Sequence, residues 1–169
     1  MYGPREELLN FINKAKGVDE EGENTILSLN KFVPMPKELD GTTAPPDKVN
    51  PQLIKKYGAD NWYDWNIRNW GCKWNINPDS IYSNVEGLFH VSVQGEVIKS
   101  KKVRMVYYSF DTPWSPPEKA IKTIGRMFPK LKFVLEYWEG GACFQGKLVI
   151  KNGRIIEDKC YDYHGKKGG

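Results

Sequence analysis

The chain has 169 residues, of which 40% are hydrophobic and 13% aromatic, so it is long enough to bury the core of one domain. Its 25 Lys and Arg against 21 Asp and Glu give a net charge of +4, which argues against a DNA-mimic inhibitor, since that class needs a large negative charge. The three cysteines, Cys72, Cys143 and Cys160, form no CxxC pair and only two histidines are present, which argues against a zinc site.

The first part of the chain predicts a helix, a strand and a long loop. Residues 25–33 alternate in part between apolar and polar side chains, which predicts a strand that ends at the prolines that follow. Residues 37–48 contain several structure breakers, so we expect a loop, and its length hints at function or mobility. The helix is predicted over residues 4–16, where one apolar face is made by Leu8, Leu9, Phe11, Ile12 and Ala15.

A second helix is predicted from Asn50 and Pro51. An asparagine can cap the first N–H groups of a helix, and a proline fits the first helical position. We expect this helix to continue to about Arg68, with an interruption near Gly58. Residues 72–76 then begin a strand.

A β-hairpin insertion is predicted at about residues 79–102. Its strands are Leu88–Ser92 and Glu96–Lys99, with a turn at Gln94 and Gly95. Residues 101–104 lead from it into the next strand.

The clearest strand, turn and helix of the sequence lie between Met105 and Phe128. Met105–Phe110 is an apolar and aromatic run of the strand type. Ser115 then stands where an N-cap belongs, with Pro116 at the first helical position and Glu118 three residues after the serine, which is the pattern of a capping box. The apolar face of the helix follows at helical spacing: Ala120, Ile121, Ile124, Met127 and Phe128.

The C-terminal part predicts three strands in succession. Residues 131–137 alternate well, and residues 143–150 return after a pair of glycines. Asn152 and Gly153 are a type I′ turn signal before a last strand at 154–158. We expect residues 161–169 to be a polar, frayed tail.

The order of these elements predicts an α+β fold. Residues 1–23 form an N-terminal helix and a link. Residues 24–160 form a ferredoxin-like domain, in which strand–helix–strand units build an antiparallel sheet of the split βαβ type, with the β-hairpin as an extension.

Five short motifs, spread over roughly residues 50–150, carry a resemblance to a known family. They are NWGCKW at 69–74, FDTPWSPP at 110–117, FPKL at 128–131, EYWE at 136–139 and FQG at 144–146. Their combination resembles the ferredoxin-like domain of YubB and Api-like proteins, which bacteriophages, plasmids and other bacterial mobile elements carry. Pro113 and the long segment 77–102 depart from the family pattern. The resemblance implies a ferredoxin-like fold and a phage or plasmid setting, and it carries over no catalytic residues.

The strongest candidate for a binding site is a set of aromatic and polar side chains that the split βαβ order places near one another. Trp and Tyr rings with a lysine and arginines suit stacking on a base or another ring, and the helix start at Ser115 offers backbone N–H groups to an anion. The alternative is a core in which Trp70, Trp74 and Trp114 hold a helix to the sheet. The candidate residues for a ligand or partner are Trp70, Lys73, Trp74, Asp111, Trp114, Ser115, Glu136, Tyr137, Trp138 and Phe144.

Motifs of nucleophilic, phosphate-binding or metal-dependent enzymes are absent from the sequence. Asp111 with Glu136 or Glu139 could act as an acid and base pair or hold a divalent metal. The alternatives are a turn residue for Asp111 and a solvent-facing strand position for Glu136. We therefore expect no catalytic residue, no metal and no cofactor.

These observations favour a non-catalytic accessory protein of a phage or mobile element that binds a host factor. We expect counter-defence, either by occluding an immune effector or by sequestering an anionic nucleotide signal. A single-stranded nucleic-acid-binding protein is one alternative, supported by the basic run at residues 99–104, and a metal-assisted hydrolase is another. No apolar stretch approaches a membrane span or a signal peptide, so we expect a soluble protein in the cytoplasm of the bacterial host.

Overall fold

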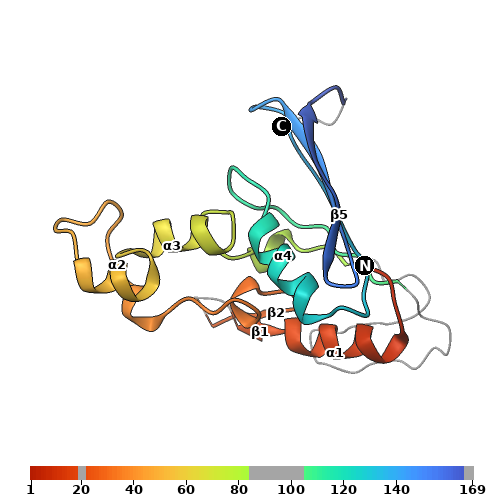
Figure 1. Cartoon of the computed structure of the whole chain (residues 1–169), viewed down its shortest axis with the longest axis horizontal. Helices are drawn as coiled ribbons and strands as arrows, with labels where there is room; N and C mark the ends of the chain where they lie inside the picture. The colour runs from red at the N-terminus through yellow and green to blue at the C-terminus, as the bar shows by residue number, and fades with distance from the viewer. Residues whose placement is uncertain (19–21, 84–104, 166–169) are drawn as a thin grey trace.

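The structure, a computed structural model of the whole chain, describes residues 1–18, 22–83 and 105–165 (Figure 1). In these residues the helices are α1 (Arg5–Ala15), α2 (Pro51–Tyr57), α3 (Trp62–Asn69) and α4 (Glu118–Met127). The strands are β1 (Gly17–Val18), β2 (Asn24–Thr25), β3 (Phe133–Glu139), β4 (Phe144–Lys151) and β5 (Arg154–Asp162). Three short 3₁₀ helices are η1 (Leu29–Lys31), η2 (Lys37–Leu39) and η3 (Pro78–Ser80). Helices packed on antiparallel strands confirm the predicted α+β class.

The main sheet is an antiparallel meander in the order β3-β4-β5. The β3–β4 register places Phe133 opposite Ile150, and these inward positions are buried, as the alternation of the sequence predicts. Asn152 and Gly153 join β4 to β5 with φ angles of 53° and 69°, which confirms the predicted type I′ turn. β5 continues to Asp162, so the first two residues of the expected frayed tail belong to the sheet.

The predicted first helix is α1, and its buried side chains are Leu8, Phe11, Ile12 and Ala15. The predicted cap at Asn50 is also confirmed, because its side-chain oxygen accepts hydrogen bonds from the backbone N–H groups of Gln52 at 3.1 Å and Leu53 at 3.3 Å. The interruption near Gly58 separates α2 from α3. These helices lie on the side of the molecule away from β5 (Figure 1).

Two predicted strands are wrong, and in both places side-chain hydrogen bonds replace a ladder. Residues 25–33 contain only the end of β2 and the helix η1, and residues 72–76 contain no strand. Asn75 connects the two segments, because its amide oxygen accepts from the backbone N–H of Leu29 at 2.8 Å and its amide nitrogen donates to Ser28 at 2.9 Å. The predicted hairpin strands at 88–99 and the lead-in at 101–104 lie outside the described residues.

The predicted capping box of the central helix is also wrong. α4 begins at Glu118, two residues after the predicted first helical residue Pro116, and no side chain caps it. The backbone N–H of Glu118, which the box assigns to Ser115, donates to the Pro116 carbonyl at 2.8 Å. The Ser115 hydroxyl instead donates to the backbone carbonyl of Gly71 at 2.6 Å. Ser115 therefore connects the start of α4 to the end of α3.

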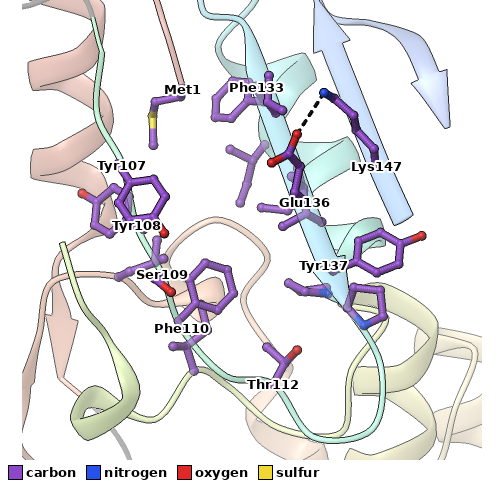
Figure 2. Close-up of a pocket in the computed structure, with 18 of the residues that line it drawn as sticks. Met1, Tyr107, Tyr108, Ser109, Phe110, Thr112, Phe133, Glu136, Tyr137 and Lys147 are labelled. Atoms are coloured by element: carbon purple, nitrogen blue, oxygen red, sulfur yellow. Dashed lines mark ion pairs between the residues drawn. The ribbon is translucent and has the colours of Figure 1, made fainter. Parts of the chain in front are cut away.

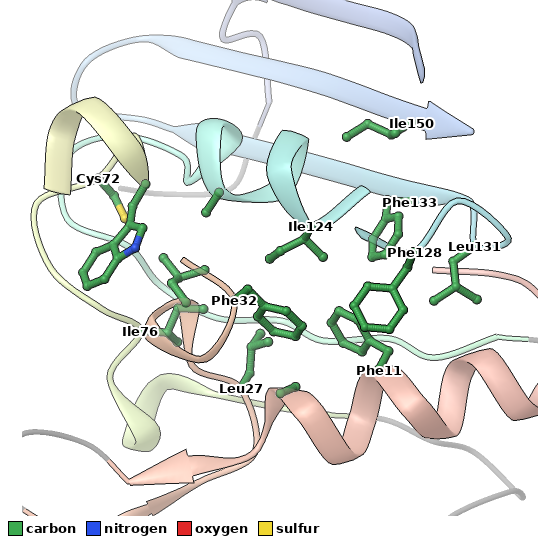
Figure 3. Close-up of a cluster of buried hydrophobic side chains, with 14 of the residues drawn as sticks. Phe11, Leu27, Phe32, Cys72, Ile76, Ile124, Phe128, Leu131, Phe133 and Ile150 are labelled. Atoms are coloured by element: carbon green, nitrogen blue, oxygen red, sulfur yellow. The ribbon is translucent and has the colours of Figure 1, made fainter. Parts of the chain in front are cut away.

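The core lies between α1, α4 and the inner face of the sheet (Figure 3). Phe11 of α1 is at its centre, with ring centroids 5.1 Å from Phe32, 5.4 Å from Phe128 and 5.8 Å from Phe133. Because Phe128 and Phe133 flank the turn between α4 and β3, these contacts fix α1 against α4 and β3.

Candidate functional site

A recess lies between residues 105–112 and β3, and its volume is about 930 Å³ (Figure 2). Tyr107, Tyr108 and Phe110 lie on one wall, and Glu136 and Tyr137 lie on the other. Residues 105–110 are extended, as the sequence predicts, but in the described chain they pair only through isolated bridges at Met105 and Ser109. The predicted strand is therefore a wall of a cavity and not a member of the β3-β4-β5 sheet.

The N-terminal dipeptide occupies one end of this recess and bonds to both walls. The Met1 amino group donates to the Val106 carbonyl at 2.7 Å, and the Val106 N–H donates to the Met1 carbonyl at 2.9 Å. Tyr2 exchanges two backbone bonds with Lys132, at 2.8 and 2.7 Å. Both bridges are antiparallel, so the two walls run parallel to each other with one strand's width between them at this end.

The free edge of β3 faces the recess. Successive residues of a strand turn their N–H and C=O groups to opposite sides. Because Lys132 bonds to Tyr2, the alternation directs the backbone groups of Val134 and Glu136 into the recess, and those of Leu135 toward β4. The described residues supply no backbone partner on that side for Val134 or Glu136.

The opposite wall, residues 105–112, also directs backbone groups into the recess. Ser109 exchanges backbone bonds of 2.7 and 2.8 Å with Tyr82, so its groups face away from β3, whereas those of Val106 face Met1. The alternation therefore directs the backbone groups of Tyr108 and Phe110 into the recess. Two edges whose backbone groups find no backbone partner among the described residues thus face each other.

The bottom of the recess is apolar and its outer side is polar. Phe11, Leu29, Ile121, Ile124 and Leu135 line it from the core, and all of them are buried or partly buried. On the outer side the lining includes the charged residues Lys132, Lys147, Glu136, Glu139 and Asp111. The charges of Lys147 and Glu136 are paired at 2.9 Å (Figure 2).

The structure brings six of the ten predicted site residues together. Asp111, Ser115, Glu136, Tyr137, Trp138 and Phe144 all line the recess. Tyr137 and Phe144 contact each other edge to face with centroids 6.1 Å apart, and burial, assisted by a hydrogen bond to Glu118, raises the pKa of the Tyr137 hydroxyl.

The other four predicted residues lie outside the lining of the recess. Trp70 is 2% exposed in the core, where its indole N–H donates to the Val33 carbonyl at 2.8 Å. Trp74 is exposed with the Lys73 ammonium 4.7 Å from its ring centroid. Trp114 is 78% exposed and has a φ of 65°. The three indoles therefore do not share one hollow.

Two of the three carboxylates considered for acid–base or metal chemistry, those of Glu136 and Glu139, have other partners. Glu139 accepts hydrogen bonds from the backbone N–H groups of Gly141 and Ala142, which closes the β3–β4 turn. Glu136 is paired with Lys147. No group of three or more His, Cys, Asp or Glu residues suited to a metal ion occurs in the described parts of the chain.

The predicted site omits five residues that shape the recess, namely Met1, Tyr2, Tyr108, Phe110 and Val134. Their role depends on which way their backbone N–H and C=O groups point, and side-chain type does not predict this. The one available signal is topological: a split βαβ unit separates its two parallel strands by the width of another strand.

Residues 95–167 match the model of a protein family described as the ferredoxin-like domain in Api92-like protein. The match includes both walls of the recess, α4 and the whole β3-β4-β5 sheet. The matched residues therefore form a domain of the ferredoxin-like class. The match supports the resemblance to the Api-like ferredoxin-like family. No curated protein and no solved structure matches the chain significantly. Across the described residues, no helix combines the length and the apolar character needed to cross a membrane.

Proposed function

We propose that the protein is a non-catalytic binding protein and that the recess between residues 105–112 and β3 holds its partner. The observation that supports this most is the recess itself, about 930 Å³ in volume, with an apolar bottom and a charged outer side. Pockets of this size with a few placed polar groups are typical of binding sites.

The lining favours a protein partner over an anionic nucleotide. Asp111, Glu136 and Glu139 place three carboxylates around the recess against two lysines, one of which is already paired. The start of α4 is a poor anion site, because Pro116 and Pro117 have no N–H group. The N–H groups of Glu118 and Ala120 are also taken, by the carbonyls of Pro116 and Trp70.

The biological setting that we propose is that of a bacteriophage or another mobile element, with the protein acting in the host cytoplasm. The resemblance to YubB and Api-like proteins supports this setting. A mobile element gains from a small accessory protein that engages host machinery, so we propose counter-defence, in which the recess occludes a host immune effector. A nucleic-acid accessory role and a metal-assisted hydrolase are less well supported, because the described lining has no basic stripe and no group of acidic side chains suited to a metal ion.

The test is a calorimetric titration against a panel of purified bacterial defence effectors and of cyclic and ADP-ribose-type nucleotides. The informative variant is Ile121→Trp, which enlarges a side chain at the bottom of the recess. Ile54→Trp is the matched control, because Ile54 is exposed on α2 and outside the recess.

We expect at least one effector to bind the native protein and the Ile54→Trp variant equally, and to lose about tenfold or more in affinity with Ile121→Trp. Binding of a nucleotide in the recess would contradict the choice of a protein partner. An effector that binds all three proteins equally would place the site elsewhere, and a panel with no binder would contradict the binding function.

A further inference from the structure

We propose that the partner enters the recess as an extended segment that becomes a β-strand between residues 108–110 and 134–136, antiparallel to both walls. This inference rests on the proposed binding function and gives it a mode of recognition and a class of ligand. The ligand is a stretch of a partner protein with apolar side chains at alternate positions.

The N-terminal dipeptide shows how such a segment fits. Met1 and Tyr2 already behave as an inserted strand, because Met1 bonds to Val106 on one wall and Tyr2 bonds to Lys132 on the other. They fill only one end, and the recess continues beyond Met1 to Thr112 (Figure 2). A partner segment that continues the line of Met1 and runs in the same direction would lie between walls that are the same distance apart.

The unused backbone groups set the register of this segment. Val134 and Glu136 on β3, and Tyr108 and Phe110 on the opposite wall, each direct an N–H and a C=O into the recess. An inserted strand alternates its own groups between the two sides, so about four or five residues satisfy both walls. Main-chain hydrogen bonds of this kind supply affinity in strand addition, and side-chain pockets supply specificity.

The two faces of the recess set the side-chain pattern. Side chains that point inward meet Phe11, Ile121 and Ile124, so every second residue is apolar. Side chains that point outward lie beside Glu136, Lys147 and Lys132, so the others are polar. Met1 and Tyr2 already follow this pattern, since Met1 packs against the core and Tyr2 is 45% exposed.

The experiment uses the full chain and a capped heptapeptide of alternating sequence, acetyl-Ser-Val-Thr-Val-Thr-Val-Ser-amide. The control peptide has the same sequence with the three valine nitrogens methylated, which removes their donors and keeps the side chains. Residue-resolved amide hydrogen exchange is measured by NMR with and without about 1 mM peptide.

The alternating peptide is expected to slow exchange at Tyr108, Phe110, Val134 and Glu136 by about tenfold or more, and the methylated peptide is expected to have no effect. Val134→Pro removes the donor on the recess side and is expected to abolish this protection at the remaining sites, whereas Val134→Ala is expected to keep it. If Val134→Pro fails to fold, the comparison of the two peptides on the native protein still tests whether a strand inserts.

Unchanged exchange with the alternating peptide would overturn the inserted strand. Peptide binding that Ile121→Trp abolishes, without protection at Val134 and Glu136, would overturn the strand and leave the recess as a binding site. Slow exchange of Val134 and Glu136 in the free protein would show that the chain itself, or a second copy of it, already fills the recess, and would also overturn the proposal.

Discussion

Met1 and Val106 exchange two backbone hydrogen bonds, so the first residue of the chain lies beside a wall that is more than a hundred residues away in sequence. This contact buries the Met1 amino group and lowers its pKa from 8.0 to about 6. The contact therefore makes folding sensitive to pH.

Stability is expected to rise between about pH 6 and about pH 8 because of this amino group. In that range the unfolded chain holds the proton more strongly than the folded chain, so protonation favours unfolding. The loss of unfolding free energy caused by this protonation is complete below about pH 6 and absent above about pH 8. A pKa difference of about two units corresponds to a loss of about 2–3 kcal/mol at most. Urea unfolding at both ends of this range measures it. The Nα-acetylated protein is the control, and an equal pH dependence of both proteins would contradict the burial of the amino group.

The tryptophans predicted to share a site are expected to differ sharply in their contribution to stability. Trp70→Ala removes a buried indole and its hydrogen bond to Val33, which costs about 3–5 kcal/mol of unfolding free energy. Trp114→Ala is expected to change it by less than about 1 kcal/mol, since that side chain is 78% exposed. Thermal and urea unfolding of the two variants measure the contrast, and similar losses would show that both indoles belong to the core.

We expect Ser115 to stabilise the fold through its hydrogen bond to Gly71 and not by capping α4. Ser115→Ala loses one side-chain hydrogen bond, which costs about 1 kcal/mol. Gly71→Ala places a Cβ 3.1 Å from the Pro116 carbonyl at a φ of 92°, so we expect a loss of about 1–3 kcal/mol.

A double-mutant cycle of these two substitutions separates the interpretations. Coupling of about 0.5 kcal/mol or more supports the link between α3 and α4. Independent effects, together with a loss of helical circular dichroism in Ser115→Ala alone, would restore the capping interpretation.

The three thiols are expected to react unequally. Burial raises the pKa of Cys72 to about 12, so its reactive thiolate is scarce, whereas Cys143 and Cys160 are exposed. Titration with a thiol-specific disulfide reagent is expected to modify Cys143 and Cys160 rapidly in the native protein, and Cys72 only after denaturation. Rapid native reaction at Cys72, identified by peptide mapping, would contradict its burial.

The parts of the fold that sequence predicts well are governed by neighbouring residues. The cap at Asn50, the turn at Asn152 and Gly153, and the alternation of β3 each depend on groups a few positions apart. The order of these elements already predicted the ferredoxin-like class, and the family match over residues 95–167 supports it.

The parts that sequence predicts poorly depend on distant partners. The Ser115 hydroxyl bonds to Gly71, and the Asn75 side chain bonds to Leu29. Both partners are more than forty residues away in sequence, so the local capping and strand patterns do not predict these contacts. The recess is a further case. It depends on the direction of backbone N–H and C=O groups and on the position of Met1 between the walls, and side-chain type predicts neither. The six predicted residues that do line it were found because the order of strands and helix in the sequence placed their segments near one another.

The most direct measurement of the central claim, that two strand edges face each other with unused hydrogen-bonding groups, is amide hydrogen exchange along β3 in the free protein. We expect fast exchange at Val134 and Glu136, and exchange slower by about tenfold or more at Phe133, Leu135 and Tyr137, whose N–H groups face β4. Uniformly slow exchange from Phe133 to Tyr137 would contradict it.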